Sequence, residues 1–356
     1  MKIGVDYSSV IVKKTGIGSF ASYLVKTMAV KAQGMEFLRY QPVGERDLNT
    51  LGRIYWESVL LGRKAAKDKA DILYSPGFSP PPYSRCPRVV TVHDLIGLIY
   101  PGNVRPAARF YWSKWLPSNL KKAEVLVASS HSTKRDIVKF LSIPEDKIQV
   151  VPLAVNSFYE KTGDAEAIEV TLKKYGIKKP FFISVSTLEP RKNFIRLLRA
   201  YEVLKKRGQG HFSIVIVGKP GGAQGELDHF VREKGLSDAV HFLGYTCDED
   251  LIYLYNAALG YVMISLYEGF GLPVLEAMSC GLAGIISNNS SLPEVAGNTA
   301  LSVDPENEDE IADALFRFFS ESQLREKMAE AAYARSKEFS IERTAHQMLD
   351  IFKHAV

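Results

Sequence analysis

The sequence predicts an α/β protein with two doubly wound domains, each a parallel β-sheet covered by helices on both faces. The chain has 356 residues, which is more than one hydrophobic core usually supports. Short β-branched runs alternate with helix-length stretches, the pattern of strands joined by crossover helices. This alternation occurs twice in series, so we expect two such domains.

The first half of the chain contains alternating strand and helix candidates. The expected strands are 2–7, 37–43, 71–75, 88–93, 125–129 and 149–153. The expected helices are 18–32, 48–67, 106–122 and 132–141. A polar, weakly patterned segment follows residue 156, so we place the first domain at 1–156.

The second half repeats the pattern. The expected strands are 181–186, 213–217, 240–243, 260–264, 284–287 and 301–303. Expected helices include 194–207, 227–234, 248–257 and 273–279. We place the second domain at 157–339, and expect a final amphipathic helix, at about 340–356, to pack back on the first domain.

Composition excludes several classes of protein. No apolar run approaches the roughly 18 residues that a membrane-spanning helix requires, and Asp6 and Ser8 interrupt the apolar N-terminal stretch, unlike a secretory signal. The three cysteines, Cys86, Cys247 and Cys280, are not spaced for a metal. They indicate reduced thiols in a cytoplasmic protein.

Charge is distributed unevenly. Residues 1–156 hold 23 basic and 12 acidic side chains, a net +11, whereas residues 157–356 hold 22 and 28, a net −6. The basic half suggests an anionic partner: a membrane surface, a phosphorylated acceptor or nucleic acid. No recognition motif accompanies the charge, so we do not expect nucleic-acid binding.

The strongest candidate site is the segment 266–276, Leu-Tyr-Glu-Gly-Phe-Gly-Leu-Pro-Val-Leu-Glu, which follows a strand and opens a helix. Pro273 suits the first helical turn. The glycines let the backbone approach a ligand, and the helix start favours an anion such as phosphate. Glu276 is then suited to ribose hydroxyls and Glu268 to those of a sugar. The alternative is a plain turn with two surface carboxylates.

A second loop, 187–193, also follows a strand and opens a helix, with Asn193 as the expected N-cap. Two adjacent cations there suit a diphosphate. Arg191 can bind it bidentately, and Lys192 acts as a point charge. A solvated basic turn is the alternative.

Two loops of the first domain are weaker candidates. The segment 15–19 contains Gly16 and Gly18 but lacks the third glycine of a dinucleotide fingerprint. It is either a plain turn or a loop that closes over phosphates. His93 ends an apolar run, where it either contacts a sugar hydroxyl or is a core or capping histidine.

Two other patterns have structural explanations. The run Asp248-Glu249-Asp250 matches a metal-binding Asp-x-Asp motif, but with Thr246 it is more typical of a capping box. We expect no metal. The aromatic and basic stretch 105–122 is either an ordinary packed helix or a contact with a membrane or lipid-linked acceptor.

These residues together resemble a known family. The run SLYEGFGLPVLEAMSCG (265–281) resembles the Glu-x7-Glu signature of glycosyltransferase family 4, which has the two-domain GT-B fold with a central cleft. TLEPRKNFIRLLRAY, VHFLGYTCDEDLIYLYNAA and SSLPEVAG fit the same donor domain in order, and GIGSFASYL and VVTVHDL resemble the acceptor domain. Within that family, the sequence most resembles bacterial mannosyltransferases of polysaccharide and lipopolysaccharide assembly.

The resemblance implies roles for the second domain. Arg191 and Lys192 are expected to stabilise the diphosphate leaving group, and Glu276 to bind the ribose. Glu268 is expected to hold the donor sugar and phosphate together with the backbone of the next four residues, Gly269, Phe270, Gly271 and Leu272.

Other roles implied by the resemblance lie outside these two loops. The nucleotide base is expected at Gly244 and Tyr245. In the first domain, Gly16 and Gly18 are expected to close over the phosphates, and His93 to contact the donor sugar or the acceptor. At 15–16 this chain has Thr-Gly where the family commonly has two glycines.

The implied reaction is metal-independent transfer from a nucleotide-diphosphate sugar, with retention of configuration and no cofactor. GDP-mannose is the favoured donor and a glycan or lipid-linked molecule the acceptor. Because the resemblance places Glu268 on sugar hydroxyls, we favour front-face attack over double displacement. We expect a cytoplasmic enzyme, peripheral on the inner face of the membrane.

Three other interpretations stay open. One is a glucosyl- or N-acetylglucosaminyltransferase that uses a UDP- or ADP-sugar. Another is a sugar-phosphate or nucleotide-sugar enzyme of the same architecture, such as a phosphorylase or epimerase. The third is a catalytically silent module that binds nucleotide sugars.

Overall fold

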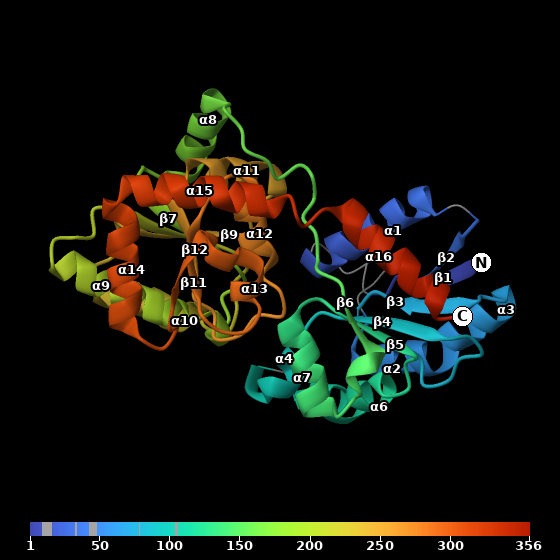
Figure 1. The fold of residues 1–356 in the computed structure, drawn as a ribbon. Coiled ribbons are helices and arrows are strands. Elements are labelled where there is room, and N and C mark those ends of the chain that lie inside the picture. The colour runs from blue at the N-terminus through green and yellow to red at the C-terminus, as the bar shows by residue number, and fades with distance from the viewer. Residues whose placement is uncertain (9–15, 33, 43–47, 78, 104–105) are drawn as a thin grey trace. The chain divides into compact units, whose positions relative to one another are not determined.

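A computed structural model describes residues 1–8, 16–32, 34–42, 48–77, 79–103 and 106–356 of the chain. The chain divides into two compact units (Figure 1). The N-terminal unit comprises Met1–Asn156 and Phe339–Val356, and the C-terminal unit comprises Ser157–Glu338. Each unit contains a six-stranded sheet in which every described pair of neighbouring strands is parallel. The predicted α/β class with two doubly wound sheets is confirmed.

The sheet of the N-terminal unit has the order β2-β1-β3-β4-β5-β6. Its strands are β1 (Lys2–Asp6), β2 (Glu36–Tyr40), β3 (Ile72–Ser75), β4 (Arg88–Val92), β5 (Val125–Ala128) and β6 (Ile148–Val150). All four residues of β3 are buried, as expected for a central strand covered on both faces.

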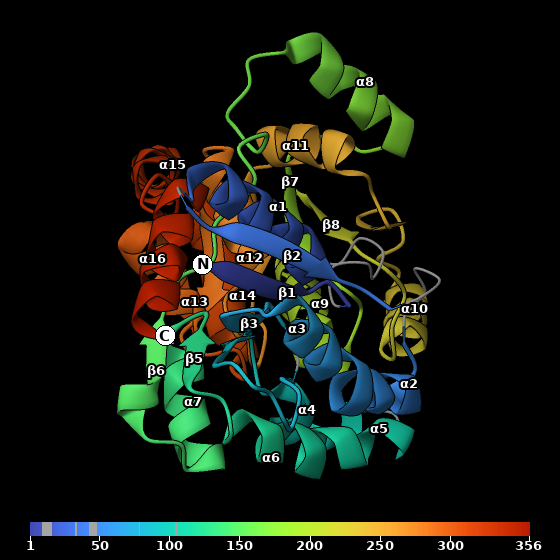
Figure 2. The same ribbon diagram turned by 90° about the vertical axis from the view of Figure 1, so that its right-hand side faces the viewer.

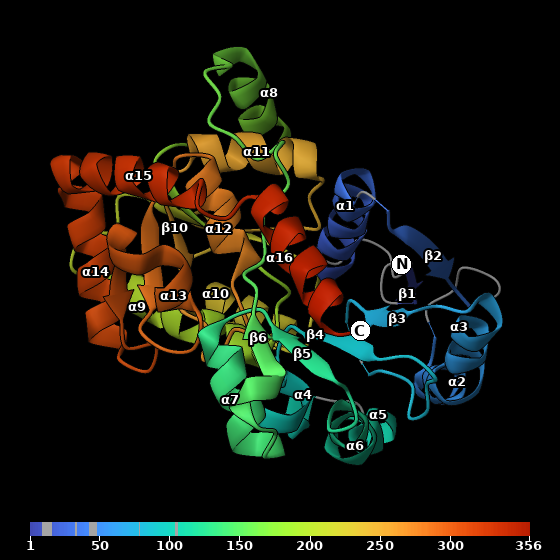
Figure 3. The same ribbon diagram turned by 45° about the vertical axis from the view of Figure 1, so that its right-hand side comes forward.

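Helices surround this sheet. They are α1 (Gly16–Lys31), α2 (Thr50–Tyr55), α3 (Gly62–Asp68), α4 (Ile96–Ile99), α5 (Pro106–Phe110), α6 (Leu116–Leu120), α7 (His131–Leu141) and α16 (Ile341–His354). Figure 3 shows α16 beside α1. Phe352 of α16 packs edge-on against Tyr74, with ring centroids 5.2 Å apart, so the end of the chain contributes to the N-terminal core.

The sheet of the C-terminal unit has the order β12-β11-β10-β7-β8-β9. Its strands are β7 (Phe181–Val185), β8 (Ser213–Val217), β9 (Val240–Gly244), β10 (Gly260–Met263), β11 (Gly284–Ser287) and β12 (Ala300–Val303). The chain builds outward from β7 to β9, then returns to place β10 against the other side of β7. Ligands of open parallel sheets bind at such a reversal, beyond the carboxyl ends of the two strands.

The helices of this unit lie on both faces of its sheet (Figure 2). They are α8 (Ala165–Tyr175), α9 (Phe194–Lys206), α10 (Gln224–Glu233), α11 (Asp248–Ala257), α12 (Leu272–Ser279), α13 (Leu292–Ala296), α14 (Glu308–Ser320) and α15 (Ser322–Ser336). Pro273 lies in the first turn of α12, as the sequence predicted.

Two local expectations were wrong, and one predicted helix is correct in extent to within two residues but differs in its hydrogen-bond pattern. The N-cap of α11 is Cys247, without a side-chain cap, so Thr246 is one residue too early for a capping box. The helix predicted at 106–122 contains a π-helical segment, Tyr111–Trp115, between α5 and α6. Gly16 and Gly18 lie in the first turn of α1 rather than in a loop, while the preceding residue falls outside the described part of the chain.

A buried carboxyl joins two helical segments of the N-terminal unit. Glu57 accepts hydrogen bonds from the Tyr111 hydroxyl at 2.9 Å and from the Trp115 indole at 2.8 Å. Burial raises the pKa of Glu57 to about 8, even though both hydrogen bonds lower it. Glu57 is therefore protonated at neutral pH in the folded protein.

Replacing Glu57 by Gln should flatten the pH dependence of stability. Because the folded pKa of about 8 lies above the ordinary value of 4.5, the unfolded chain releases this proton first, and stability falls as pH rises from about 4.5 to about 8. Wild type should lose on the order of 3 kcal/mol more than Glu57→Gln between pH 5 and 8.

Urea unfolding followed by tryptophan fluorescence measures this difference. All three tryptophans of the chain, Trp56, Trp112 and Trp115, lie in the N-terminal unit, so the signal reports the unit that contains Glu57. Glu145→Gln, at an exposed position, is the control. Equal pH dependence in wild type and Glu57→Gln would contradict the assignment.

Candidate active site

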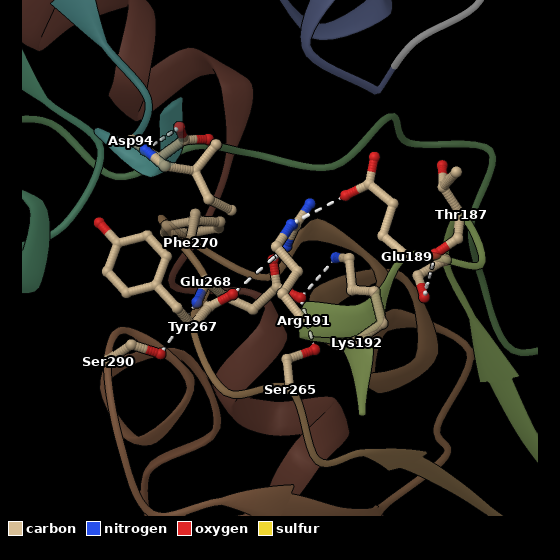
Figure 4. Close-up of polar contacts among 12 residues, drawn as sticks. Asp94, Thr187, Glu189, Arg191, Lys192, Ser265, Tyr267, Glu268, Phe270 and Ser290 are labelled. Carbon is tan, nitrogen blue, oxygen red and sulfur yellow. Dashed lines mark hydrogen bonds and ion pairs between the residues drawn. The ribbon is translucent and has the colours of Figure 1, made fainter. Parts of the chain in front are cut away.

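The loops after β7 and β10 meet at the reversal of the C-terminal sheet, and Figure 4 shows their side chains converging. Arg191 and Lys192 lie in a single 3-10 turn, Pro190–Lys192, which follows β7. Glu268 lies between β10 and α12. The backbone N–H of Leu266 donates to the carbonyl of Arg191 at 2.9 Å, which fixes one loop against the other.

The Glu268 carboxylate is the centre of this cluster. Its Oε1 lies 2.5 Å from Lys192 Nζ and accepts a 2.7 Å hydrogen bond from the Ser265 hydroxyl, while its Oε2 lies 3.4 Å from Arg191 Nη1. Glu268 is only 8% exposed. Burial alone would raise its pKa, but the charges of Lys192 and Arg191, with the hydrogen bonds, hold it below the ordinary value. Glu268 is thus an anion that holds two cations.

Arg191 is held from three directions. Its Nε donates to Glu189 Oε2 at 3.0 Å, and its Nη1 donates to the Tyr267 carbonyl at 3.3 Å as well as to Glu268. Nη2 forms no hydrogen bond within the described part of the chain. Arg191 therefore keeps Nη2 available to an anion, whereas its Nε and Nη1 already contact protein groups.

Asn193 connects the end of the turn Pro190–Lys192 to the loops that follow β10 and β12. It precedes α9 in the left-handed conformation, with φ 61°, which Asn tolerates better than most residues. Its amide donates to the carbonyls of Ile264 and Pro305, at 3.1 and 2.6 Å, so it makes no side-chain cap on α9. The predicted N-cap position is correct, but the side chain serves instead to join two loops.

A serine pair fixes the segment between Glu268 and α12. The Ser291 hydroxyl contacts the carbonyls of Glu268 and Phe270, both at 2.9 Å, and Ser290 Oγ accepts from the Glu268 N–H at 3.1 Å. Gly271 has φ 103°, and a Cβ there would lie 2.6 Å from Leu292. Only glycine fits this turn.

The backbone segment predicted for the phosphate is therefore tied to Ser291 through the Phe270 carbonyl. It comprises Gly269, Phe270, Gly271 and Leu272, of which the first three are buried. Leu272 begins α12, so its N–H is among those at a helix start that lack an intrahelical partner.

Glu276 occupies a different environment from Glu268. The Tyr255 hydroxyl donates to its Oε2 at 3.2 Å, and no cation pairs with it among the described residues. Burial raises the pKa of Glu276 to about 7, with the Tyr255 hydrogen bond acting in the opposite direction. The carboxyl is poised to accept hydrogen bonds from a ligand's hydroxyl groups near neutral pH.

Gly244 and Tyr245, predicted beside the base, end β9 and begin the next loop. Gly244 adopts φ 70°, and its carbonyl accepts from the Gly218 N–H at 2.8 Å. Tyr245 is 47% exposed, and Lys219 Nζ lies 5.3 Å from its ring centroid. Together they present an aromatic face with an adjacent cation.

The remaining predicted site residues, His93, Gly16 and Gly18, belong to the N-terminal unit. His93 Nε2 lies 2.8 Å from the Pro76 carbonyl, whereas its Nδ1 is buried without a hydrogen-bond partner in the described structure. Burial lowers the pKa of His93, against the opposing effects of Pro76 and Asp94, so the imidazole is neutral at pH 7.

The Asp-x-Asp pattern is occupied by protein partners. Asp248 accepts from the Tyr159 hydroxyl at 3.3 Å, and Asp250 accepts from Lys174 and the Tyr175 hydroxyl at 2.5 and 2.7 Å. Within the ranges that the structure describes, no cluster of His, Cys, Asp or Glu is arranged to hold a metal ion.

Sequence reasoning missed the supporting residues of this site. They are Glu189, Tyr255, Ser265, Ser290 and Ser291. Glu189 stands two residues before Arg191, a spacing that was visible in the sequence. Ser265 is likewise close in sequence, three residues before Glu268. Tyr255, Ser290 and Ser291 lie on elements whose proximity to the site depends on the tertiary fold.

Comparison with known proteins places the chain among glycosyltransferases. A family described as Glycosyl transferases group 1 matches residues 168–335, and one described as Glycosyltransferase Family 4 matches residues 32–157. The O-antigen chain mannosyltransferase B of Escherichia coli is 31% identical over 95% of this chain and 96% of its own length.

Solved structures share the fold at lower identity. A glycosyltransferase from Rickettsia africae superposes with a TM-score of 0.76 at 20% identity, over 99% of this chain and 98% of its own. Anabaena HepE, in a complex with UDP-glucose, gives a TM-score of 0.75 at 19% identity, over 99% and 100%.

Replacing Tyr255 by Phe should raise the pKa of Glu276 above about 7, because the lost hydrogen bond stabilises the carboxylate. Titration of ¹³C-labelled glutamate carboxyls by NMR measures this, with the Glu276 signal assigned from its absence in Glu276→Gln. Tyr253→Phe, on the same helix, is the control. A Glu276 pKa unaffected by Tyr255→Phe would refute the proposed coupling.

Proposed function

Because the chain belongs to glycosyltransferase family 4 and is a glycosyltransferase, we propose that it transfers mannose from GDP-mannose to a glycan or lipid-linked acceptor, with retention of configuration. The observation that carries this proposal is the cluster of Arg191, Lys192 and Glu268 at the reversal of the C-terminal sheet. It supplies two oriented cations where a donor diphosphate would bind.

The choice of sugar and base has separate support. Mannose is supported by the similarity to an O-antigen mannosyltransferase that spans nearly the whole chain. A nucleotide sugar is supported by the shared fold with a protein whose structure contains UDP-glucose. GDP is favoured by the resemblance of the sequence motifs to mannosyltransferases, and UDP and ADP are the alternatives.

Stabilisation of the leaving group is the main chemical task. As the bond between the anomeric carbon and the phosphate oxygen breaks, negative charge develops on the diphosphate. Lys192 Nζ keeps protons to donate beyond the one directed at Glu268, and Arg191 Nη2 faces no protein acceptor in the described structure. Cations fixed before the reaction stabilise this charge without reorganisation.

The environment of Glu268 favours front-face attack over double displacement. A carboxylate paired with two cations and hydrogen-bonded by Ser265 has a low pKa and is a weak nucleophile. We therefore assign the attack to the acceptor hydroxyl. Its oxygen forms the new bond to the anomeric carbon, and the departing phosphate oxygen takes its proton.

Glu276 is the proposed ribose ligand. Its carboxylate can accept hydrogen bonds from two vicinal hydroxyls, and this requires the deprotonated form. Because its pKa is about 7, donor binding should weaken as pH falls below neutrality.

Contact with an anionic membrane surface is a further part of the proposal. Arg109, Lys114 and Lys121 are exposed, whereas Tyr111 is buried in the core. Phe110 is also exposed, so this stretch presents an aromatic ring together with its cations at the surface. In the described part of the chain, no helix combines the length and apolarity needed to cross a bilayer.

Lys192→Ala should lower mannosyl transfer about 100-fold or more, because a preorganised donor to the leaving group is lost. The assay measures GDP release from GDP-mannose in the presence of an oligomannoside or lipid-linked acceptor, with UDP-glucose and ADP-glucose as alternative donors. Wild type should prefer GDP-mannose.

Lys206→Ala, at an exposed helix position, is the matched control and should retain wild-type turnover. Full activity in Lys192→Ala would refute the diphosphate assignment. A preference for UDP- or ADP-sugars would change the assigned donor but would not contradict the proposed mechanism. Release of free mannose phosphate would indicate a phosphorylase, and binding without turnover of any donor a silent module.

A further inference from the structure

We propose that a basic pocket in the N-terminal unit binds a phosphoryl group of a ligand other than the sugar donor. The pocket has a volume of about 600 Å³ and lies between α3, with the π-helical turn before it (Trp56–Leu61), and the segment Tyr83–Arg85. This inference concerns a different unit from the cluster of Arg191, Lys192 and Glu268, and does not depend on the donor's identity.

A glycine allows the two walls to come together. A Cβ at Gly62 would lie 2.6 Å from the Tyr83 carbonyl oxygen, so a larger residue would push the segment away from the helix. The two residues before this segment are held by Arg88, whose Nη1 donates to the carbonyls of Pro81 and Pro82, both at 3.3 Å. Arg88 is itself paired with Glu124 at 2.9 Å. The pocket is therefore built on a supported backbone.

Three cations line the pocket: Arg63, Lys67 and Arg85. All three are exposed, none forms an ion pair with any described residue, and no carboxylate is among the lining side chains. Arg63 and Lys67 are four residues apart on one helix, an arrangement of like charges that destabilises a helix. An anion between them and Arg85 would offset this repulsion.

The chemistry of the lining favours phosphate over other anions. Two planar guanidinium groups can bind phosphoryl oxygens bidentately. Ser84 adds a hydroxyl, which the Cys86 N–H already orients at 3.3 Å. The volume exceeds what a single phosphate fills, so there is room for a diphosphate or a phosphorylated headgroup.

Inorganic pyrophosphate is the direct probe, and the methyl groups of Val59, which lines the pocket, are the local reporter. Their NMR shifts should respond to pyrophosphate in wild type. Affinity at this site should fall at least tenfold in the triple variant Arg63→Gln, Lys67→Gln, Arg85→Gln. The charge-matched control Lys31→Gln, Lys139→Gln, Lys147→Gln, at exposed positions, should bind as wild type.

Sedimentation with phosphatidylglycerol vesicles identifies the source of the phosphoryl group. Loss of vesicle binding in the pocket variant but not in the control assigns the pocket to a lipid headgroup. A Val59 response to pyrophosphate without such a loss assigns it to a soluble phosphorylated ligand. If the two triple variants behave alike in both measurements, the proposal is wrong.

Discussion

The buried ion pair of Glu268 with Lys192 and Arg191 is the interaction on which the proposed donor site depends. It joins the loops after β7 and β10, the two strands at which the chain reverses direction in the sheet. Removing a carboxylate from water is costly, and the two cations with Ser265 offset that cost. Loss of one partner would leave a buried charge uncompensated, which typically costs about 3–5 kcal/mol. Glu268 thus determines where the two cations lie before any ligand enters.

Hydrogen bonds from neighbouring residues hold the two loops in this arrangement. Asn193 joins the turn Pro190–Lys192 to Ile264, immediately after β10, and the Ser291 hydroxyl contacts the Glu268 carbonyl. Eight residues further on, Glu276 has no cation beside it in the described structure, so burial raises its pKa, whereas the charges of Lys192 and Arg191 hold the pKa of Glu268 below its ordinary value. The two carboxylates of this motif therefore differ in role. Glu268 holds two cations, and Glu276 is suited to accept hydrogen bonds from hydroxyl groups.

Sequence alone predicted the parallel sheets and the loops that carry the site, because hydrophobic periodicity, Pro273 and the glycines are local signals. It did not predict that Glu268 faces Lys192 and Arg191, since the pairing depends on β10 returning beside β7. For the same reason, the contact between Tyr255 and Glu276 was not predictable. The hydrogen bonds of Tyr111 and Trp115 to Glu57 were likewise not predictable, because Glu57 is more than 50 residues away along the chain.

A double-mutant cycle on turnover tests the central claim, that Glu268 acts through the cations it holds. The four proteins are wild type, Lys192→Ala, Glu268→Gln and the double variant, assayed for kcat with saturating GDP-mannose. If the pair acts as a unit, the double variant should lose about as much activity as the worse single variant. Losses that multiply would show that Glu268 and Lys192 act independently, and would contradict this account.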